Sequence, residues 1–175
     1  MPTRLLLQLA AFAAIGCVLG AVTTMLNTAI ASFSPPLYAL TGSLWMLVPM
    51  TARLWSILTG SATVVGALTG LLMMPFTALG VLLPLSLIGQ GLVFDLILWK
   101  AERPAAWRLM TAAGVTGILI GVCSLPVINP ETLSVALVIA VIVLRLVAMI
   151  AFAALAAMLV RQLTLRGVRP LARTH

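Results

Sequence analysis

The chain has 175 residues, of which 63% are hydrophobic and only 7% are charged. A soluble domain carries roughly 45–50% apolar residues, and a chain of this length has too small an interior to bury so many more. The formal net charge of +7 comes from ten basic and three acidic residues, too few for a nucleic-acid interface. The composition excludes a soluble globular protein and predicts an integral membrane protein with no nucleic-acid partner.

Breaker and turn residues divide the chain into apolar segments of about the 20 residues that a helix needs to cross a bilayer. In chain order the six segments are Leu5–Ala29, Leu37–Leu54, Ile57–Met74, Leu79–Trp99, Leu109–Val127 and Leu133–Val160. Helices are favoured because lipid cannot satisfy backbone polar groups, and no segment has the alternating pattern of a barrel strand. We therefore expect one all-α domain over residues 1–175, a bundle of six transmembrane helices followed by a basic cytoplasmic tail at 161–175.

The basic residues predict the orientation, since Lys and Arg concentrate in cytoplasmic loops. With the N-terminus inside, the cytoplasmic segments hold nine of the ten: Arg4, Arg53, Lys100, Arg103, Arg108, Arg161, Arg166, Arg169 and Arg173. The tenth, Arg145, lies within the sixth segment, and the external segments hold none. We expect a multi-pass protein of a bacterial or archaeal plasma membrane with both ends in the cytoplasm, its tail against anionic lipid headgroups.

The first segment carries the densest series of small residues, with Ala10 and Ala14 four residues apart on one helix face. Small residues at this spacing let membrane helices approach closely. We expect Ala10 and Ala14 to dock another membrane subunit and the remaining small pairs to pack the bundle itself. Those pairs include Gly16/Gly20, Gly66/Gly70 and Gly117/Gly121.

Motifs of common catalytic and metal sites are missing from the sequence. It has no GxxxxGK[ST], HExxH, CxxC or GxSxG, and its only histidine is His175. Cys17 and Cys123 fall within apolar segments, where a thiol is most simply a small buried hydrophobic group. We expect no enzymatic activity, no cofactor and no metal, and favour a transporter or a binding subunit.

Two ionisable residues fall inside the predicted spans, Arg145 near the middle of the sixth and Asp95 toward the inner end of the fourth. A charge inside a bilayer is costly, so each is expected to face the bundle interior with a partner. Arg145 lies about 24 Å along a helix from Arg161, whereas Asp95 lies about 7–8 Å from Lys100. The difference weighs against a direct pair but leaves two alternatives for Arg145, a ligand-binding cation or an ion pair with Asp95.

Polar and aromatic residues in the outer half of the predicted bundle form a candidate binding site. The expected substrate-binding residues are Trp45, Gln90, Phe94 and Arg145, with Asn27 and Tyr38 near the outer surface. Gln90 and Phe94 are four residues apart and share a helix face. Amide and hydroxyl groups would orient a small ring-containing ligand, an aromatic side chain would stack on it, and Arg145 would bind an acceptor group.

Three stretches of the chain are similar to one known family: Leu37–Arg53 with Tyr38 and Trp45, Gly91–Asp95, and Arg145 followed by Leu163–Val168. With six spans and an Ala-rich first span, the chain resembles the substrate-binding S components of energy-coupling factor (ECF) vitamin transporters, and among them the YkoE family. The resemblance covers residues 5 to 172. It departs at Ala67–Pro75, which lacks the acid and the Trp that the family tends to carry there.

The resemblance implies a binding subunit for a vitamin or vitamin precursor, with hydroxymethylpyrimidine or a thiamine-related compound as the candidate. It implies docking on a transmembrane coupling subunit through the first span, two ATPase subunits that drive import, and closure by the loop around Ile30–Pro36. The alternative is a small self-sufficient transporter or channel-like homo-oligomer that works without ATPase subunits. An accessory or assembly membrane protein is a third possibility.

Overall fold

The computed structural model describes residues 3–77, 80–101, 104–124 and 134–168, and every regular element in them is helical. Three helices are long and apolar enough to cross a bilayer: α1 (Thr3–Phe33), α6 (Ala106–Ser124) and α7 (Val135–Leu165). The remaining elements are α2 (Pro35–Ser43), η1 (Leu44–Met46), α3 (Leu47–Ser56), α4 (Ser61–Met73), η2 (Met74–Phe76) and α5 (Leu82–Ile97). Of these, α4 with η2 and α5 are shorter apolar helices. The described residues confirm an all-α protein, and its hydropathy identifies a multi-pass membrane protein.

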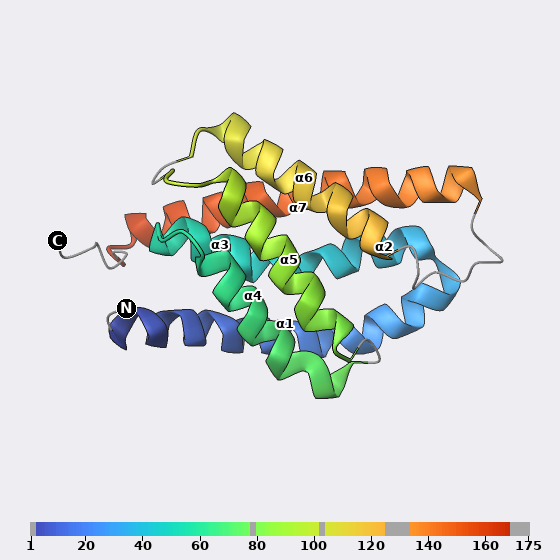
Figure 1. Ribbon diagram of the computed structural model, residues 1–175, viewed down its shortest axis with the longest axis horizontal. Helices are drawn as coiled ribbons and strands as arrows, with labels where there is room; N and C mark the ends of the chain where they lie inside the picture. The colour runs from blue at the N-terminus through green and yellow to red at the C-terminus, as the bar shows by residue number, and fades with distance from the viewer. Residues whose placement is uncertain (1–2, 78–79, 102–103, 125–133, 169–175) are drawn as a thin grey trace.

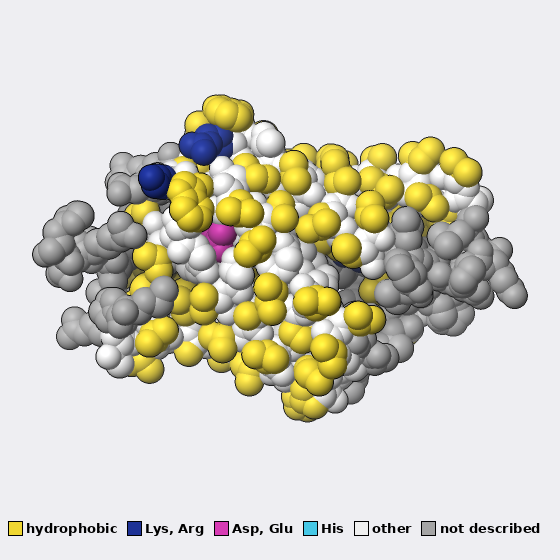
Figure 2. All heavy atoms as spheres, in the orientation of Figure 1, with side chains coloured by type: hydrophobic (Ala, Val, Ile, Leu, Met, Phe, Trp, Pro, Cys, Tyr) yellow, Lys and Arg dark blue, Asp and Glu magenta, His cyan; other side chains and the backbone are white. Residues whose placement is uncertain are grey.

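The helices pack as a ring in which α1 contacts α4, α4 contacts α5, α5 contacts α6, and α6 contacts α7. The ring closes through α2 and α3, which pack against both α7 and α1. Figure 1 shows the start of α1 and the end of α7 at the same end of the bundle. Figure 2 shows hydrophobic side chains spread across the described part of the visible face. Large hydrophobic residues such as Val18 and Leu85 are 67% and 66% exposed. An apolar surface of this extent fits a lipid environment.

The second predicted span is interrupted. From the sequence it is a continuous helix over Leu37–Leu54, but the structure divides this stretch into α2, η1 and α3. Pro49 supplies a physical reason, because a proline ring clashes with the carbonyl four residues earlier and donates no hydrogen bond. That carbonyl belongs to Trp45, the central residue of η1, where the helix tightens to a 3₁₀ turn.

Glycine pairs set the closest helix contacts, as the small-residue spacing predicts. A Cβ on Gly66 would lie 2.7 Å from the carbonyl oxygen of Leu87, and one on Gly70 would lie 2.4 Å from Cα of Pro84. Both contacts join α4 to α5. Gly117 on α6 likewise approaches the backbone of α7. A side chain at Gly66 or Gly70 would force the two helices apart, and one at Gly117 would need a shift of a few tenths of an ångström.

From the sequence Arg53 is expected in a cytoplasmic loop, but the structure buries it in the last turn of α3 with a 2% exposed side chain. Its Nε lies 3.1 Å from Oδ1 of Asp95, and its Nη2 donates to the carbonyl of Leu98 at 2.8 Å. The other carboxylate oxygen of Asp95 accepts from the backbone N–H and hydroxyl of Thr63. The prediction of a structural partner for Asp95 is confirmed, but the alternative that pairs Asp95 with Arg145 is wrong.

Basic residues gather at the end of the bundle where α1 begins and α7 ends. Apart from Arg145, the basic side chains of the described residues all lie there: Arg53, Lys100, Arg108, Arg161 and Arg166. Figure 2 shows the dark-blue side chains of its visible face at that end. Arg103, Arg169, Arg173, the side chain of Arg4 and the predicted external segment near Asn129 lie outside the described residues. That the basic end of the bundle faces the cytoplasm stays a prediction.

Candidate ligand-binding site

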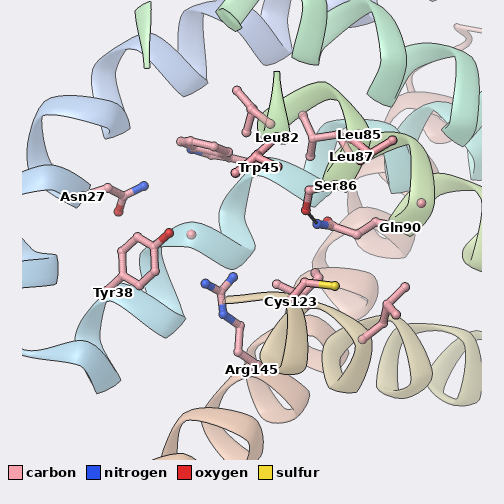
Figure 3. Close-up of a pocket in the computed structure, with 15 residues that line it drawn as sticks. Asn27, Tyr38, Trp45, Leu82, Leu85, Ser86, Leu87, Gln90, Cys123 and Arg145 are labelled. Atoms are coloured by element: carbon pink, nitrogen blue, oxygen red, sulfur yellow. Dashed lines mark hydrogen bonds between the residues drawn. The ribbon is translucent and has the colours of Figure 1, made fainter. Parts of the chain in front are cut away.

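A cavity of about 560 Å³ lies in the half of the bundle away from the basic end. Its volume is in the range of small-molecule sites, roughly 300–1,000 Å³. The polar and aromatic lining residues are Asn27, Tyr38, Trp45, Ser86, Gln90 and Arg145, all labelled in Figure 3. They come from the end of α1, from α2 and η1, from the first half of α5 and from α7.

Five of the six residues expected to bind substrate line this cavity: Asn27, Tyr38, Trp45, Gln90 and Arg145. Phe94 does not. It lies one turn beyond Gln90 along α5, is fully buried, and belongs to the hydrophobic core with Met50 and Leu98. Its role is to hold helices together, so we remove it from the candidate site.

Arg145 is the only charged residue among the described residues that line the cavity, and it is 3% exposed. Its guanidinium carbon lies 5.4 Å from the centre of the Tyr38 ring, a cation–π contact. A Cβ on Gly42 would lie 3.1 Å from both terminal nitrogens, so the absence of a side chain at Gly42 makes room for the guanidinium. Figure 3 shows the group directed into the cavity from α7.

Among the described residues Arg145 has no carboxylate partner. Asp95 is the only acid in those residues, and it pairs with Arg53. The Nε of Arg145 is buried without a hydrogen-bond partner in the described part of the chain. A buried cation without a counter-charge is unfavourable, so a negatively charged acceptor brought by a ligand would stabilise it.

Asn27 is a second unsatisfied group at the same end of the cavity. Its side chain is 5% exposed, and neither the amide nitrogen nor the oxygen has a partner among the described residues. Buried amides are nearly always hydrogen-bonded, and leaving one unpaired costs about 1–3 kcal/mol. In Figure 3 Asn27, Tyr38 and Arg145 converge from α1, α2 and α7. The arrangement offers both donors and an acceptor to one polar group.

Trp45 and Gln90 are held by neighbours that the sequence analysis missed. The indole N–H of Trp45 donates to the hydroxyl of Thr23 on α1 at 2.6 Å, which fixes the ring as a wall of the cavity. The amide of Gln90 donates to the Ser86 hydroxyl at 2.7 Å. Ser86 could have been found, because it precedes Gln90 by four residues on the same helix face.

The remaining wall is apolar and comes from α5 and α6. Its large residues are Leu82, Leu83, Leu85, Leu87, Leu119 and Ile120. Cys123 also lines the cavity and is exposed, which corrects the expectation of a buried thiol. A Cβ on Gly89 would meet no atom within 4 Å, so this glycine leaves open space in the wall.

Comparison with protein-family models, curated proteins and solved structures finds no match for this chain. The resemblance to the ECF S components therefore stays a prediction. In the described residues no group of three or more His, Cys, Asp or Glu side chains could hold a metal ion.

Proposed function

We propose that the protein is a membrane-embedded binding subunit that captures a small ring-containing ligand for import. The observation that carries this proposal is the cavity, which places a buried arginine without a carboxylate partner beside an asparagine without a hydrogen-bond partner. Trp45 and Tyr38 add aromatic surface on which a ring can pack. A structural role alone would leave these polar groups unsatisfied.

The proposed setting is an ECF-type importer in a bacterial or archaeal plasma membrane. The protein would be its S component, acting with a transmembrane coupling subunit and two ATPase subunits. The sequence resemblance supports this assignment, and so does the lack of any ATPase motif in the chain. A vitamin or vitamin precursor would be the ligand, with a hydroxymethylpyrimidine or thiamine-related compound as the candidate from the resemblance.

The position of the cavity suits uptake. It lies in the half of the bundle opposite the basic residues, and the positive-inside rule assigns the basic end to the cytoplasm. With both chain ends inside, the cavity would take its ligand from the outer side.

The surface of α1 suits docking on a partner. Ala10 and Ala14 are both exposed, whereas Gly16 turns inward, where a Cβ would lie 2.8 Å from the hydroxyl of Thr69 on α4. The helix thus has one small-residue face inside the bundle and another on its surface. The outer face would let a coupling subunit approach closely.

Purification from the host in mild detergent, followed by mass spectrometry of copurifying proteins and small molecules, tests the proposal. We expect a coupling subunit, two ATPases and a ring-containing compound. Arg145→Ala should lose the compound and keep the subunits, whereas Ala14→Leu should lose the subunits and keep the compound. A homo-oligomer that carries a ligand but no ATPase would favour a self-sufficient transporter, and wild-type protein without either would contradict the proposal.

A further inference from the structure

The cavity has one polar end and one apolar end. Asn27, Tyr38 and Arg145 form the polar end, and Figure 3 shows Leu82, Leu85 and Leu87 on its other side. On α5 the amide of Gln90 donates to the Ser86 hydroxyl, so these two polar groups partly satisfy each other. A ligand that satisfies the whole cavity therefore carries a polar group at one end and an apolar body behind it.

The charge of the cavity determines which polar group the ligand can place at the polar end. Among the described lining residues Arg145 is the only ionisable one apart from Tyr38 and Cys123, and none of them is a carboxylate. A cationic ligand would be repelled in this low-dielectric setting, and a neutral one would leave the guanidinium without a counter-charge. A phosphate monoester carries roughly −1.5 to −2 at pH 7, more than one guanidinium can compensate. A ligand group with one negative charge would compensate the single positive charge of Arg145.

The unsatisfied atoms have the arrangement that a carboxylate needs. A guanidinium binds a carboxylate with two parallel N–H donors, and the Nε of Arg145 is a donor without a partner in the described residues. The amide nitrogen of Asn27 supplies a further unused donor at the same end. Both side chains are more than nine-tenths buried, so these contacts would form away from water.

We infer that the ligand is an amphipathic monocarboxylate, with its carboxylate on Arg145 and Asn27 and an apolar or aromatic body against the leucines of α5 and α6. This inference rests on the proposed function of a binding subunit and names the substrate class of the same cavity, in place of the neutral hydroxymethylpyrimidine or cationic thiamine-related candidate that the resemblance implies. It makes Arg145 the residue that determines specificity, because the guanidinium distinguishes a carboxylate from the uncharged amide of the same shape.

The thiol of Cys123 provides a direct measurement. It lines the cavity and is exposed, whereas Cys17 lies on α1 outside the lining. In a Cys17→Ser protein in detergent, the rate of N-ethylmaleimide labelling at Cys123 is followed by mass spectrometry. The probes are 2-naphthoate, 2-naphthamide and 2-naphthyl phosphate, which share one ring system and differ in charge.

We expect 2-naphthoate to slow the labelling of Cys123 at concentrations at least tenfold lower than either of the other probes. Arg145→Met should abolish the preference for naphthoate over naphthamide. Gly42→Ala provides a second variant that keeps the charge, since its new methyl group, 3.1 Å from both terminal nitrogens of Arg145, would make the guanidinium shift by a few tenths of an ångström. It should raise the naphthoate concentration for half protection at least tenfold. If the Arg145 variant does not fold, the comparison of the three probes on the Cys17→Ser protein with its cavity unchanged still tests the inference.

Equal protection by naphthamide, stronger protection by the phosphate, or no protection by naphthoate would each overturn the inference. These failures are separable from a failure of the proposed function. Protection by the neutral probe, or a neutral compound found with the purified protein, would leave a binding subunit with a different substrate class. If the purified protein carried neither a ligand nor a partner subunit, the proposed function itself would be overturned.

Discussion

Arg53 on α3 and Asp95 on α5 form an ion pair of 3.1 Å at the basic end of the bundle. Asp95 lies about 7.5 Å along α5 from Gln90, which lines the cavity. Both side chains are nearly fully buried, at 2% and 5% exposed. The pair ties α3 to α5, and Thr63 adds α4 to the same contact. Because this pair engages the only acid of the described residues, Arg145 keeps its charge for another partner.

Asp95→Asn tests this pair. The substitution keeps the size of the side chain but leaves the buried Arg53 without its counter-charge. Removal of one partner of a buried pair costs about 3–5 kcal/mol, so the melting temperature in detergent should fall sharply. The control is Arg53→Met combined with Asp95→Asn, which removes both charges and should recover part of the loss. An unchanged melting temperature in the single variant would contradict a structural role for the pair.

Two glycines on facing helices should respond oppositely to substitution. Gly89→Leu places its side chain in the cavity, where no atom lies within 4 Å of the new Cβ. We expect unchanged or slightly higher thermal stability, since a helical glycine is unfavourable by roughly 0.5–1 kcal/mol, together with loss of the copurified ligand.

Gly66→Ala is the matched control, because its methyl group would lie 2.7 Å from the carbonyl oxygen of Leu87. It should lower stability by about 1–3 kcal/mol through forced separation of α4 and α5. If Gly89→Leu retains ligand while Gly66→Ala behaves as expected, the ligand binds elsewhere.

Arg145→Ala and Gln90→Ala should each weaken ligand binding at least tenfold, about 1.4 kcal/mol. Isothermal titration of the purified protein with its copurified compound gives the affinity. Phe94→Leu serves as the comparison, because Phe94 lies in the core and not in the lining. This change should lower the melting temperature and leave the affinity as it was. Normal folding and binding in both cavity variants would make Arg145 a structural residue.

Ala10→Leu and Ala14→Leu should reduce uptake and copurification of the coupling subunit while ligand binding stays intact. Both positions are exposed, so a larger side chain disturbs no contact within the described bundle. Gly16→Leu, on the inner face of α1, should instead destabilise the protein by collision with Thr69. Unchanged uptake in both the Ala10→Leu and the Ala14→Leu variant would show that the coupling subunit docks on another surface.

Reporter fusions test the orientation. Fusions after Arg103 and at the C-terminus should read as cytoplasmic, and fusions near Ser34 and Asn129 as external, because the basic residues gather at one end of the bundle. An external reading at either cytoplasmic position would reverse the direction in which the cavity opens.

Hydropathy was enough to predict the helices, but not their ends or interruptions. The third helix was expected from Ile57 and begins at Ser61, because Ile57 and Gly60 adopt positive φ angles of 57° and 94°. The break at η1 depends on how Pro49 is accommodated, which spacing alone does not show. The helices could be predicted because a helix that crosses a bilayer needs a long apolar segment. The irregular backbone between helices depends on local contacts that the sequence does not show.

The depth of each residue along its predicted helix was enough to predict that five candidate residues lie near one another. It was not enough to predict that Phe94 lies outside the cavity. The rotation of α5 about its axis is set by its glycine contacts with α4, and that rotation turns Phe94 into the core. The burial of Arg53 was missed for a related reason. A basic residue near a helix end can reach water or a buried acid, and only the packing of α3 against α5 decides between them.

The unequal helix lengths have a consequence for the surrounding lipid. With 31 residues each, α1 and α7 extend about 46 Å, whereas α5, with 16 residues, extends about 24 Å and α4, with 13, about 20 Å. A hydrocarbon core of about 30 Å exceeds the span of the adjacent α4 and α5. A helix shorter than the hydrocarbon core is accommodated by local thinning of the bilayer or by contact with another protein, at a cost of fractions of a kcal/mol per Å of mismatch. We therefore expect the bilayer to be thinnest beside α4 and α5, and α5 forms part of the apolar wall of the cavity.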